Sequence, residues 1–260
     1  MTQIKPSFNS VKQARLADAI VEQLERMIIE GVLAPGQKLP SERELASQFN
    51  VSRPSVREAI QKLEARGLLN RKQGGGTFVS EDSWQNVAEP LFQLMVNHPE
   101  SQFDLLEFRH ALEGICAYYA ALRGTETDDE QLAQCIDDIA SVKLTDATIH
   151  THADAVMGFY LKMAEASHNA VVLQVMHCLK PLLQQNIEDN LRQMLRSLEA
   201  QHSVFNHRKH LLSMIVQREP ELARQASHEH LAYIEETLLD VSRQTTRMER
   251  SLRRVRSETK

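Results

Sequence analysis

Residues 39–79 constrain the fold of this chain more than any other stretch, because they open with a complete helix start signal. Ser41 is followed three residues later by Glu44, which is the capping-box pattern. In this pattern the two side chains satisfy two backbone N–H groups that would otherwise have no partner. We therefore predict a short helix that begins at about Glu42 and is followed by a turn over residues 49–51.

A second helix is predicted directly after this turn. Ser52 stands at its N-cap, and Gly67 stands at the C′ position that ends it. Between them, apolar residues recur at the spacing of one helix face. These residues are Val56, Ala59, Ile60 and Leu63. Residues 68–71 and 77–79 are then expected to form two strands around the glycines of 74–76, which gives the layout of a winged helix-turn-helix.

The second helix of this pair carries arginines that its apolar stripe leaves free. Arg53 lies in the first turn and Arg57 one turn later, beside the small hydroxyl groups of Ser52 and Ser55. The N-terminus of a helix attracts anions, and arginine can grip the O6 and N7 atoms of guanine with two hydrogen bonds. The pattern therefore predicts that this end of the helix enters a major groove of DNA.

The segment KLPSERELASQFNVSRPSVREAIQKLEARGLL, followed by GGGTFV, resembles the winged-helix domain of the GntR family of bacterial transcription regulators. The resemblance implies a set of residues that contact operator DNA or lie near it. These are Arg43, Ser52, Arg53, Ser55 and Arg57. It also implies that Gln73 and Gly74, at the tip of the wing, reach the minor groove.

The distribution of charge also indicates that the N-terminal part of the chain binds DNA. Residues 1–80 carry 12 Lys and Arg against 8 Asp and Glu, although the whole chain has a formal net charge of −5. Hydrophobic content of 42% and charged content of 25% are ordinary for a globular protein, so composition excludes neither a regulator nor an enzyme. The basic N-terminal part is expected to face DNA.

The cysteines and the N-terminus indicate a cytoplasmic protein. Cys116, Cys135 and Cys178 are odd in number and widely spaced, which is typical of reduced thiols rather than of a disulfide framework. The first residues contain no apolar signal core, and no run reaches the roughly 18 apolar residues of a membrane helix. We therefore expect neither export nor insertion into a membrane.

The rest of the chain shows helix-length apolar periodicity and no alternating strand pattern, which predicts an antiparallel helical bundle. The expected helices span 84–96, 104–123, 128–142, 147–167, 170–198, 201–217 and 220–242. The fold class is therefore mainly α, with a winged N-terminal domain and an all-α C-terminal domain. We expect a DNA-binding domain over 1–80, a linker over 81–83, a helical effector-binding and dimerisation domain over 84–242, and a basic tail over 243–260.

The helical half also resembles a known module, the effector domain of the GntR subgroup named after the fatty-acid regulator. The segments that carry the resemblance are LLEFRHALEGICAYYAALR, MGFYLKMAEASHN, HRKHLLSMI and ELARQASHEHLAYIEE. Within this subgroup the chain is similar to repressors of the pyruvate dehydrogenase complex genes. The resemblance implies a homodimer that binds a pseudo-palindromic operator and is released from it by pyruvate.

Arg109 is the expected contact for a carboxylate effector. Its planar guanidinium group matches a carboxylate with two parallel hydrogen bonds, and inside a bundle it can hold a small 2-keto acid. Glu113 lies four residues later, so a purely structural ion pair between the two side chains is the alternative.

Many members of this subgroup hold a divalent metal through one Asp and three His residues, and this chain departs from that pattern. His207 and His230 match two of the positions, whereas Val156 and Tyr160 occupy the other two. We therefore predict direct contact of the effector with Arg109, Tyr160, His207 and His230, and no metal. Binding through a metal is the alternative.

The sequence thus predicts a ligand-responsive transcription repressor rather than an enzyme. A regulator of the same fold that answers lactate or another small carboxylate is one alternative. A metal-dependent enzyme that uses the C-terminal histidines is a second. A constitutive dimer whose bundle serves only dimerisation is a third.

Overall fold

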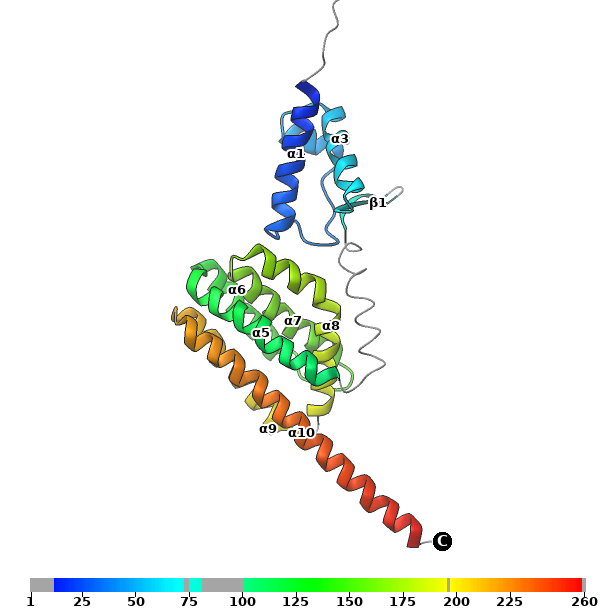
Figure 1. Cartoon of the computed structure of the whole chain (residues 1–260), viewed down its shortest axis with the longest axis vertical. Coiled ribbons are helices and arrows are strands. Elements are labelled where there is room, and N and C mark those ends of the chain that lie inside the picture. Colours follow the sequence, from blue (N-terminus) through cyan, green and yellow to red (C-terminus); the bar gives the residue numbers. More distant parts are fainter. Residues whose placement is uncertain (1–11, 73–74, 81–100, 196, 259–260) are drawn as a thin grey trace, which may run out of the picture. The chain divides into compact units, whose positions relative to one another are not determined.

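The computed structural model describes residues 12–72, 75–80, 101–195 and 197–258. The chain divides into two compact units, residues 1–87 and 88–260, and each is described here by itself (Figure 1). The predicted helix over 84–96, the predicted linker over 81–83 and the wing residues Gln73 and Gly74 lie outside the described residues.

The first unit has the predicted helix-turn-helix with a preceding helix. Its elements are α1 (Lys12–Ile29), α2 (Glu42–Gln48), α3 (Arg53–Ala65), β1 (Leu69–Lys72) and β2 (Gly76–Val79). The capping box of Ser41 and Glu44 is present with both of its hydrogen bonds, which confirms the predicted start of α2 at Glu42. Gly67 has φ +74° directly after α3, which confirms its role in ending that helix.

The core of this unit joins all three helices to the base of the wing. Buried apolar residues of α1 and α3 pack against one another, and the first residue of β1 and the last of β2 close the cluster. The two strands are antiparallel, with Leu69 opposite Val79 and Lys72 opposite Gly76. Leu69 and Val79 are buried, so the core holds the hairpin at its base.

The second unit is a bundle of helices. Its described helices are α5 (Ser101–Arg123), α6 (Glu126–Ser141), α7 (Ile149–Ala166), α8 (Ala170–Met194), α9 (Leu198–Val216) and α10 (Pro220–Glu258). α5 packs chiefly on α10 and on α7, and α7 packs on α6 and α8 (Figure 1). The expected fold class, mainly α with one small antiparallel sheet, is confirmed. None of the described helices is both long and apolar enough to cross a membrane.

Several helix boundaries differ from the predicted ones, and in two cases an N-terminal cap sets where the helix begins. Thr125 and Asp128 form a capping box, so α6 begins at Glu126 rather than at 128. The predicted helix over 170–198 ends early at Met194, because Ser197 caps α9 and starts it at Leu198. The predicted end at 242 is wrong, since α10 continues to Glu258 through the segment that was expected to be a tail.

Candidate functional site

The N-terminal end of α3 presents Arg53 to solvent. Arg53 is the first residue of the helix and makes no hydrogen bond or ion pair within the described part of the chain, and the same holds for exposed Arg43 on α2. Ser52 is the N-cap residue, but its hydroxyl group pairs with that of Ser55 at 3.0 Å instead of capping the helix. Two predicted arginines are therefore free to reach DNA.

Ser55, which was expected near the DNA contacts, is buried in the structure. Only 1% of this residue is exposed, so its hydroxyl group lies inside the unit and cannot reach a phosphate from there. Ser55 is one residue before Val56 and is buried with it on the inward side of α3. Its contact is the exposed Ser52, which it positions through the shared hydrogen bond.

Arg57 is exposed but already paired. Its Nη2 atom lies 2.8 Å from Oε2 of Glu42, and its Nε atom donates to the same carboxylate at 3.1 Å. The hydrogen bond from Arg57 lowers the pKa of Glu42, and the charge of Arg71, with Nη2 3.6 Å from Oε1 of Glu42, lowers it further. Glu42 thus holds two arginines near α3, and a DNA phosphate would have to replace it as their partner.

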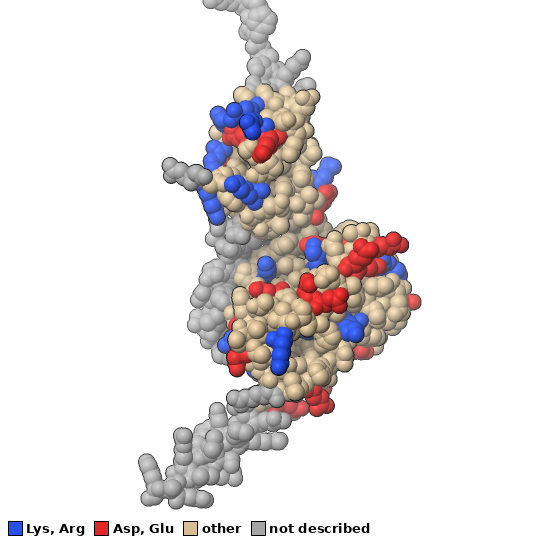
Figure 2. Space-filling model, turned by 180° about the vertical axis from the view of Figure 1, so that it is seen from behind, with Lys and Arg blue, Asp and Glu red and all other residues tan. Residues whose placement is uncertain are grey.

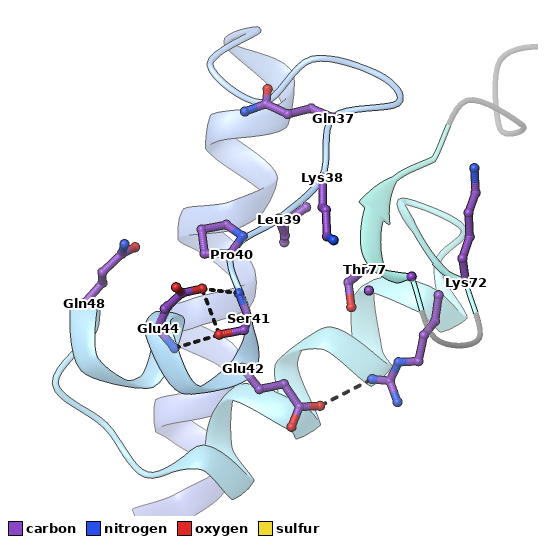
Figure 3. Close-up of a pocket in the computed structure, with 13 residues that line it drawn as sticks. Gln37, Lys38, Leu39, Pro40, Ser41, Glu42, Glu44, Gln48, Lys72 and Thr77 are labelled. Atoms are coloured by element: carbon purple, nitrogen blue, oxygen red, sulfur yellow. Dashed lines mark hydrogen bonds and ion pairs between the residues drawn. The ribbon is translucent and has the colours of Figure 1, made fainter.

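A groove of about 1160 Å³ lies between the start of α2 and the wing. Figure 3 shows the capping box of Ser41 and Glu44 on one side of it and Lys72 on the other. Lys38 and Lys72 both lie near the ring of Phe78, with Nζ atoms 5.9 and 4.9 Å from its centroid. Neither lysine was among the predicted contacts, although Lys72 belongs to the basic pair Arg71–Lys72 that precedes the wing glycines.

The other cations of α3 are paired within the unit. Lys62 lies 2.7 Å from Asp18 and 3.0 Å from Glu58, and Arg66 pairs with Glu25. Glu64 similarly lies 3.4 Å from Nε of Arg71. The acidic residues of α3, Glu58 and Glu64, therefore serve as partners for neighbouring cations.

In the helical unit, Arg109 is buried at the centre of the bundle. Only 1% of it is exposed, its Nε atom donates to Oε1 of Glu113 at 2.6 Å, and its Nη1 atom donates to Oδ1 of Asn186 at 2.9 Å. The guanidinium carbon also lies 5.4 Å from the ring centroid of Tyr160. The sequence alternative of an ion pair with Glu113 is therefore present, and the same arginine faces Tyr160.

The structure brings Tyr160, His207 and His230 together beside Arg109. The hydroxyl group of Tyr160 and Nε2 of His230 are 2.8 Å apart, and both residues are buried. His207 packs beside them, with its ring centroid 6.3 Å from that of His230. Burial and then the charges of Arg208 and Arg109 place the pKa of His230 well below 6.5, so this imidazole is neutral near pH 7.

Arg208 is a further member of this cluster that the sequence analysis did not identify. It is 4% exposed and has no ion pair within the described residues, and its Nε atom has no hydrogen-bond partner there. The charged residues buried in the described helical unit are Arg109, Arg208 and Glu113. Burial raises the pKa of Glu113 despite the adjacent Arg109. Even with Glu113 ionised, the cluster has one more positive charge than negative.

Arg208 also lines a cavity of about 400 Å³ between the α6–α7 connection, α8 and α9. Polar side chains of His152 and Gln201 contribute to the same wall. On its other side Arg208 borders a much smaller space that Arg109 also lines. Arg208 therefore borders both the open cavity and the predicted site.

The residues of this cluster do not fit a divalent metal. Val156 is completely buried and apolar, and the Nε2 atom of His230 pairs with the hydroxyl group of Tyr160. Within the parts of the chain that the structure describes, no three His, Cys, Asp or Glu side chains are grouped to hold a metal ion. Two histidines alone do not complete a coordination sphere.

Comparison with known proteins agrees with both halves of the fold. Residues 16–79 match the family described as bacterial regulatory proteins, gntR family, and residues 104–233 match the FCD domain. A winged helix that meets DNA, joined to a helical domain with a charged interior, defines the class of ligand-responsive DNA-binding regulators. This chain belongs to the GntR family of bacterial transcription regulators and carries an FCD effector domain.

Several curated relatives cover most of the chain. An Escherichia coli (strain K12) protein named for the regulation of the L-lactate dehydrogenase operon is 36% identical and covers 86% of each chain. The HTH-type transcriptional regulator LutR of Bacillus subtilis (strain 168) is 31% identical over 82% of this chain and 96% of its own. The solved structure of Streptococcus agalactiae GntR has a TM-score of 0.52 at 25% identity, covering 85% and 99%.

The surface charge differs between the two units. On the face drawn in Figure 2, Lys and Arg side chains are spread over the winged unit, and Asp and Glu side chains are frequent on the helical unit. This agrees with the basic balance of residues 1–80 and the acidic balance of the whole chain. A basic winged unit is suited to the phosphates of operator DNA.

Proposed function

We propose that this protein is a dimeric repressor of the pyruvate dehydrogenase complex genes and related genes of central metabolism, released from its operator by pyruvate. In this proposal Arg43, Arg53 and Arg57 contact the operator, and Gln73 and Gly74 reach the minor groove. The effector lies in the helical unit against Arg109, Tyr160, His207 and His230, with Arg208 as an additional contact.

The excess positive charge inside the bundle is the observation that supports an anionic effector. Arg109 and Arg208 are both buried, and Glu113 is the single acid buried with them in the described unit. An isolated buried charge is costly unless it is paired, so a carboxylate beside Arg208 would stabilise the conformation that binds it. The polar atoms without partners, Nε of Arg208 and Nδ1 of His230 and of His207, give such a ligand its hydrogen-bonding groups.

Lactate is the second candidate effector, and the names of the relatives favour it. One relative is named for the L-lactate dehydrogenase operon, and it is 36% identical to this chain over 228 residues. Lactate and pyruvate have the same carbon chain and the same carboxylate and differ in one oxygen substituent. Tyr160 and a neutral His230 could each donate to a keto oxygen or accept from a hydroxyl group, so both acids fit the same groups.

Repression and release require that the effector bind two conformations with different affinity, since equal affinity would shift no population. The test is therefore operator binding in the presence of each acid. Purified protein selects sites from random duplexes at fixed salt, because phosphate contacts make affinity steeply salt-dependent. The selected duplex is then titrated with pyruvate, lactate and acetate.

We expect a pseudo-palindromic site that pyruvate releases and acetate does not. If lactate alone releases the protein from the site, then lactate and not pyruvate is the effector. Operator binding that no acid changes would contradict the proposed effector and leave the DNA-binding function intact. Arg208→Met serves as the control protein, because it should keep the same operator and lose the response.

A further inference from the structure

α10 continues past the bundle that the other helices of its unit form. Leu231, Ile234 and Leu238 are buried in that bundle, but the helix runs on to Glu258 (Figure 1). The matched FCD domain ends at residue 233. Residues 243–258, called here the C-terminal extension, therefore lie beyond the part of the chain that matches the effector domain.

The composition of the C-terminal extension explains why it stays helical. It contains neither Gly nor Pro, and most of its residues are Arg, Gln, Met, Leu or Glu, which favour helices. At 1.5 Å per residue the extension is about 24 Å long. A helix of this length is marginal in water by itself, but here it prolongs a helix that the bundle already holds, so no new nucleus is required.

The charge along one row of α10 changes sign where the extension begins. Within the bundle, helical spacing places three exposed acids in this row, namely Glu229, Glu236 and Asp240. From residue 243 to residue 254 the same row continues with arginine. Its members there are Arg243, Arg247, Arg250 and Arg254. The extension as a whole has six arginines and two glutamates, so its net charge is +4 in a chain whose net charge is −5.

We propose that the C-terminal extension is a second DNA-contacting element, whose row of arginines binds the phosphate backbone of the duplex beside the operator. The acids of the same row within the bundle repel phosphate, so the contact begins where arginine replaces them. This inference rests on DNA binding by the winged unit, and it does not depend on which acid is the effector.

Arginine is well suited to a phosphate contact. Its planar guanidinium group can donate two parallel hydrogen bonds to one phosphate. Residues 243–256 contain six arginines and no lysine. The row of four arginines is about 17 Å long, and a duplex of that length carries about ten phosphates. Because contacts to phosphate read no base, the extension adds affinity without adding sequence preference.

Duplex DNA fits the C-terminal extension better than an anionic membrane surface does. Opposite the arginines, Thr245, Met248, Leu252 and Val255 continue the row of Leu238 at the same spacing. Helices that lie on membranes bury a broad apolar face rich in Trp, Phe and Leu. This row is narrow, contains no aromatic residue and includes a threonine. The winged unit of the same chain also binds DNA, which raises the effective concentration of duplex around the extension.

The test replaces the four arginines of the row by glutamine, which removes the charge and keeps the helix propensity. Operator affinity is measured at several salt concentrations on two duplexes. One ends at the edges of the selected site, and the other carries flanks of about 20 base pairs, two turns of the double helix, on each side. On the flanked duplex the variant should bind at least about tenfold more weakly, and the slope of log affinity against log salt should fall by about 0.9 for each lost phosphate contact. On the short duplex it should bind like the parent chain.

Three control variants separate the position of the charge from other effects. Replacing the same four arginines by lysine should keep most of the affinity and the salt slope, since lysine also binds phosphate. Arg53→Ala should weaken binding to both duplexes, because it changes the winged unit. The third control loses four exposed cations elsewhere in the helical unit and should bind both duplexes like the parent chain. Its substitutions to glutamine are at Lys180, Arg192, Lys209 and Arg224.

The proposal is overturned if the glutamine variant binds the flanked duplex like the parent chain, or if the lysine variant loses as much affinity as the glutamine variant. Equal losses on the two duplexes also overturn it, because the effect would then lie within the operator contacts. So does an equal loss in the third control, which would assign the effect to total charge. Vesicles that contain phosphatidylglycerol are assayed in parallel. Binding of the parent chain to them that the glutamine variant lacks, with unchanged operator affinity, would assign the extension to a membrane surface instead. Failure of Arg53→Ala to weaken binding would contradict the operator contacts of the proposed function and not the extension.

Discussion

The two arginines buried in the helical unit differ in whether a neighbouring acid balances their charge. Arg109 is paired with Glu113 at 2.6 Å, whereas Arg208 forms no ion pair within the described residues, although its charge also lowers the pKa of Glu113. Removing one member of a buried pair leaves the other charge without compensation, but removing an unpaired charge does not. Substitutions of Arg109 and Arg208 should therefore differ in their effects on the free energy of unfolding and on the effector response.

Arg208→Met should leave the free energy of unfolding unchanged or raise it, and should weaken the effector response by about 10- to 100-fold, the loss of one charged hydrogen bond. Arg109→Met should lower the free energy of unfolding by up to about 3–5 kcal/mol, less where Glu113 takes up a proton. Urea unfolding and effector titration measure the two quantities. Equal destabilisation by both variants would contradict the unpaired state of Arg208.

Arg53→Ala should lower operator affinity by about 1–3 kcal/mol, because a bidentate contact to a base is lost and the exposed side chain supports no other residue. Arg66→Ala is the control on the same helix, since Arg66 pairs with Glu25 at the far end of α3. Binding to the selected duplex and to a duplex with one altered half-site measures the effect. A loss equal on both duplexes would assign Arg53 to phosphate instead of a base.

His230 should make the protein less stable in acid. Burial lowers the pKa of His230 well below 6.5, so the folded state keeps it neutral while the unfolded chain protonates. Its contribution is therefore complete above pH 6.5 and is lost progressively as pH falls from there toward the folded pKa. His230→Gln keeps a partner for the Tyr160 hydroxyl and should reduce the dependence of the melting temperature on pH below 6.5. An unchanged pH profile would contradict this assignment.

At the scale of elements, two helices in different units begin with the same motif, a capping box. Ser41 with Glu44 caps α2, and Thr125 with Asp128 caps α6, each with both reciprocal hydrogen bonds. Such caps depend on neighbouring residues alone, which is why Glu42 was predictable as the start of α2. The start of α6 was missed because its cap stands in a stretch without a clear apolar period.

Ser41→Ala and Thr125→Ala should each lower the free energy of unfolding by about 0.5–2 kcal/mol, the loss of one N-cap. Only Ser41→Ala should also weaken operator binding, because α2 carries Arg43 and the Glu42 that holds Arg57. Denaturant unfolding and operator titration on both variants give the comparison. Weaker DNA binding by Thr125→Ala would show that the effect of a cap is not confined to its own unit.

At the scale of the whole molecule, release of the operator by an effector must be reciprocal. If pyruvate lowers operator affinity by a given factor, saturating operator must lower pyruvate affinity by the same factor, since both factors express one coupling free energy. Calorimetric titration of pyruvate with and without the selected duplex measures this factor, and a scrambled duplex is the control. Unequal factors would show that pyruvate acts outside this equilibrium.

The sequence by itself determined the winged unit, the all-helical class of the second unit and the placement of Arg53 at the exposed start of α3. Caps, a C′ glycine and an apolar period act over a few residues, so their effect can be read without knowing the fold. Only the tertiary structure decided that Ser55 is buried, that Arg208 is buried without an ion pair in the described residues, and that α5 is apolar on its outer side. Each of these depends on which face of a helix its neighbours cover, and the packing of distant segments sets that.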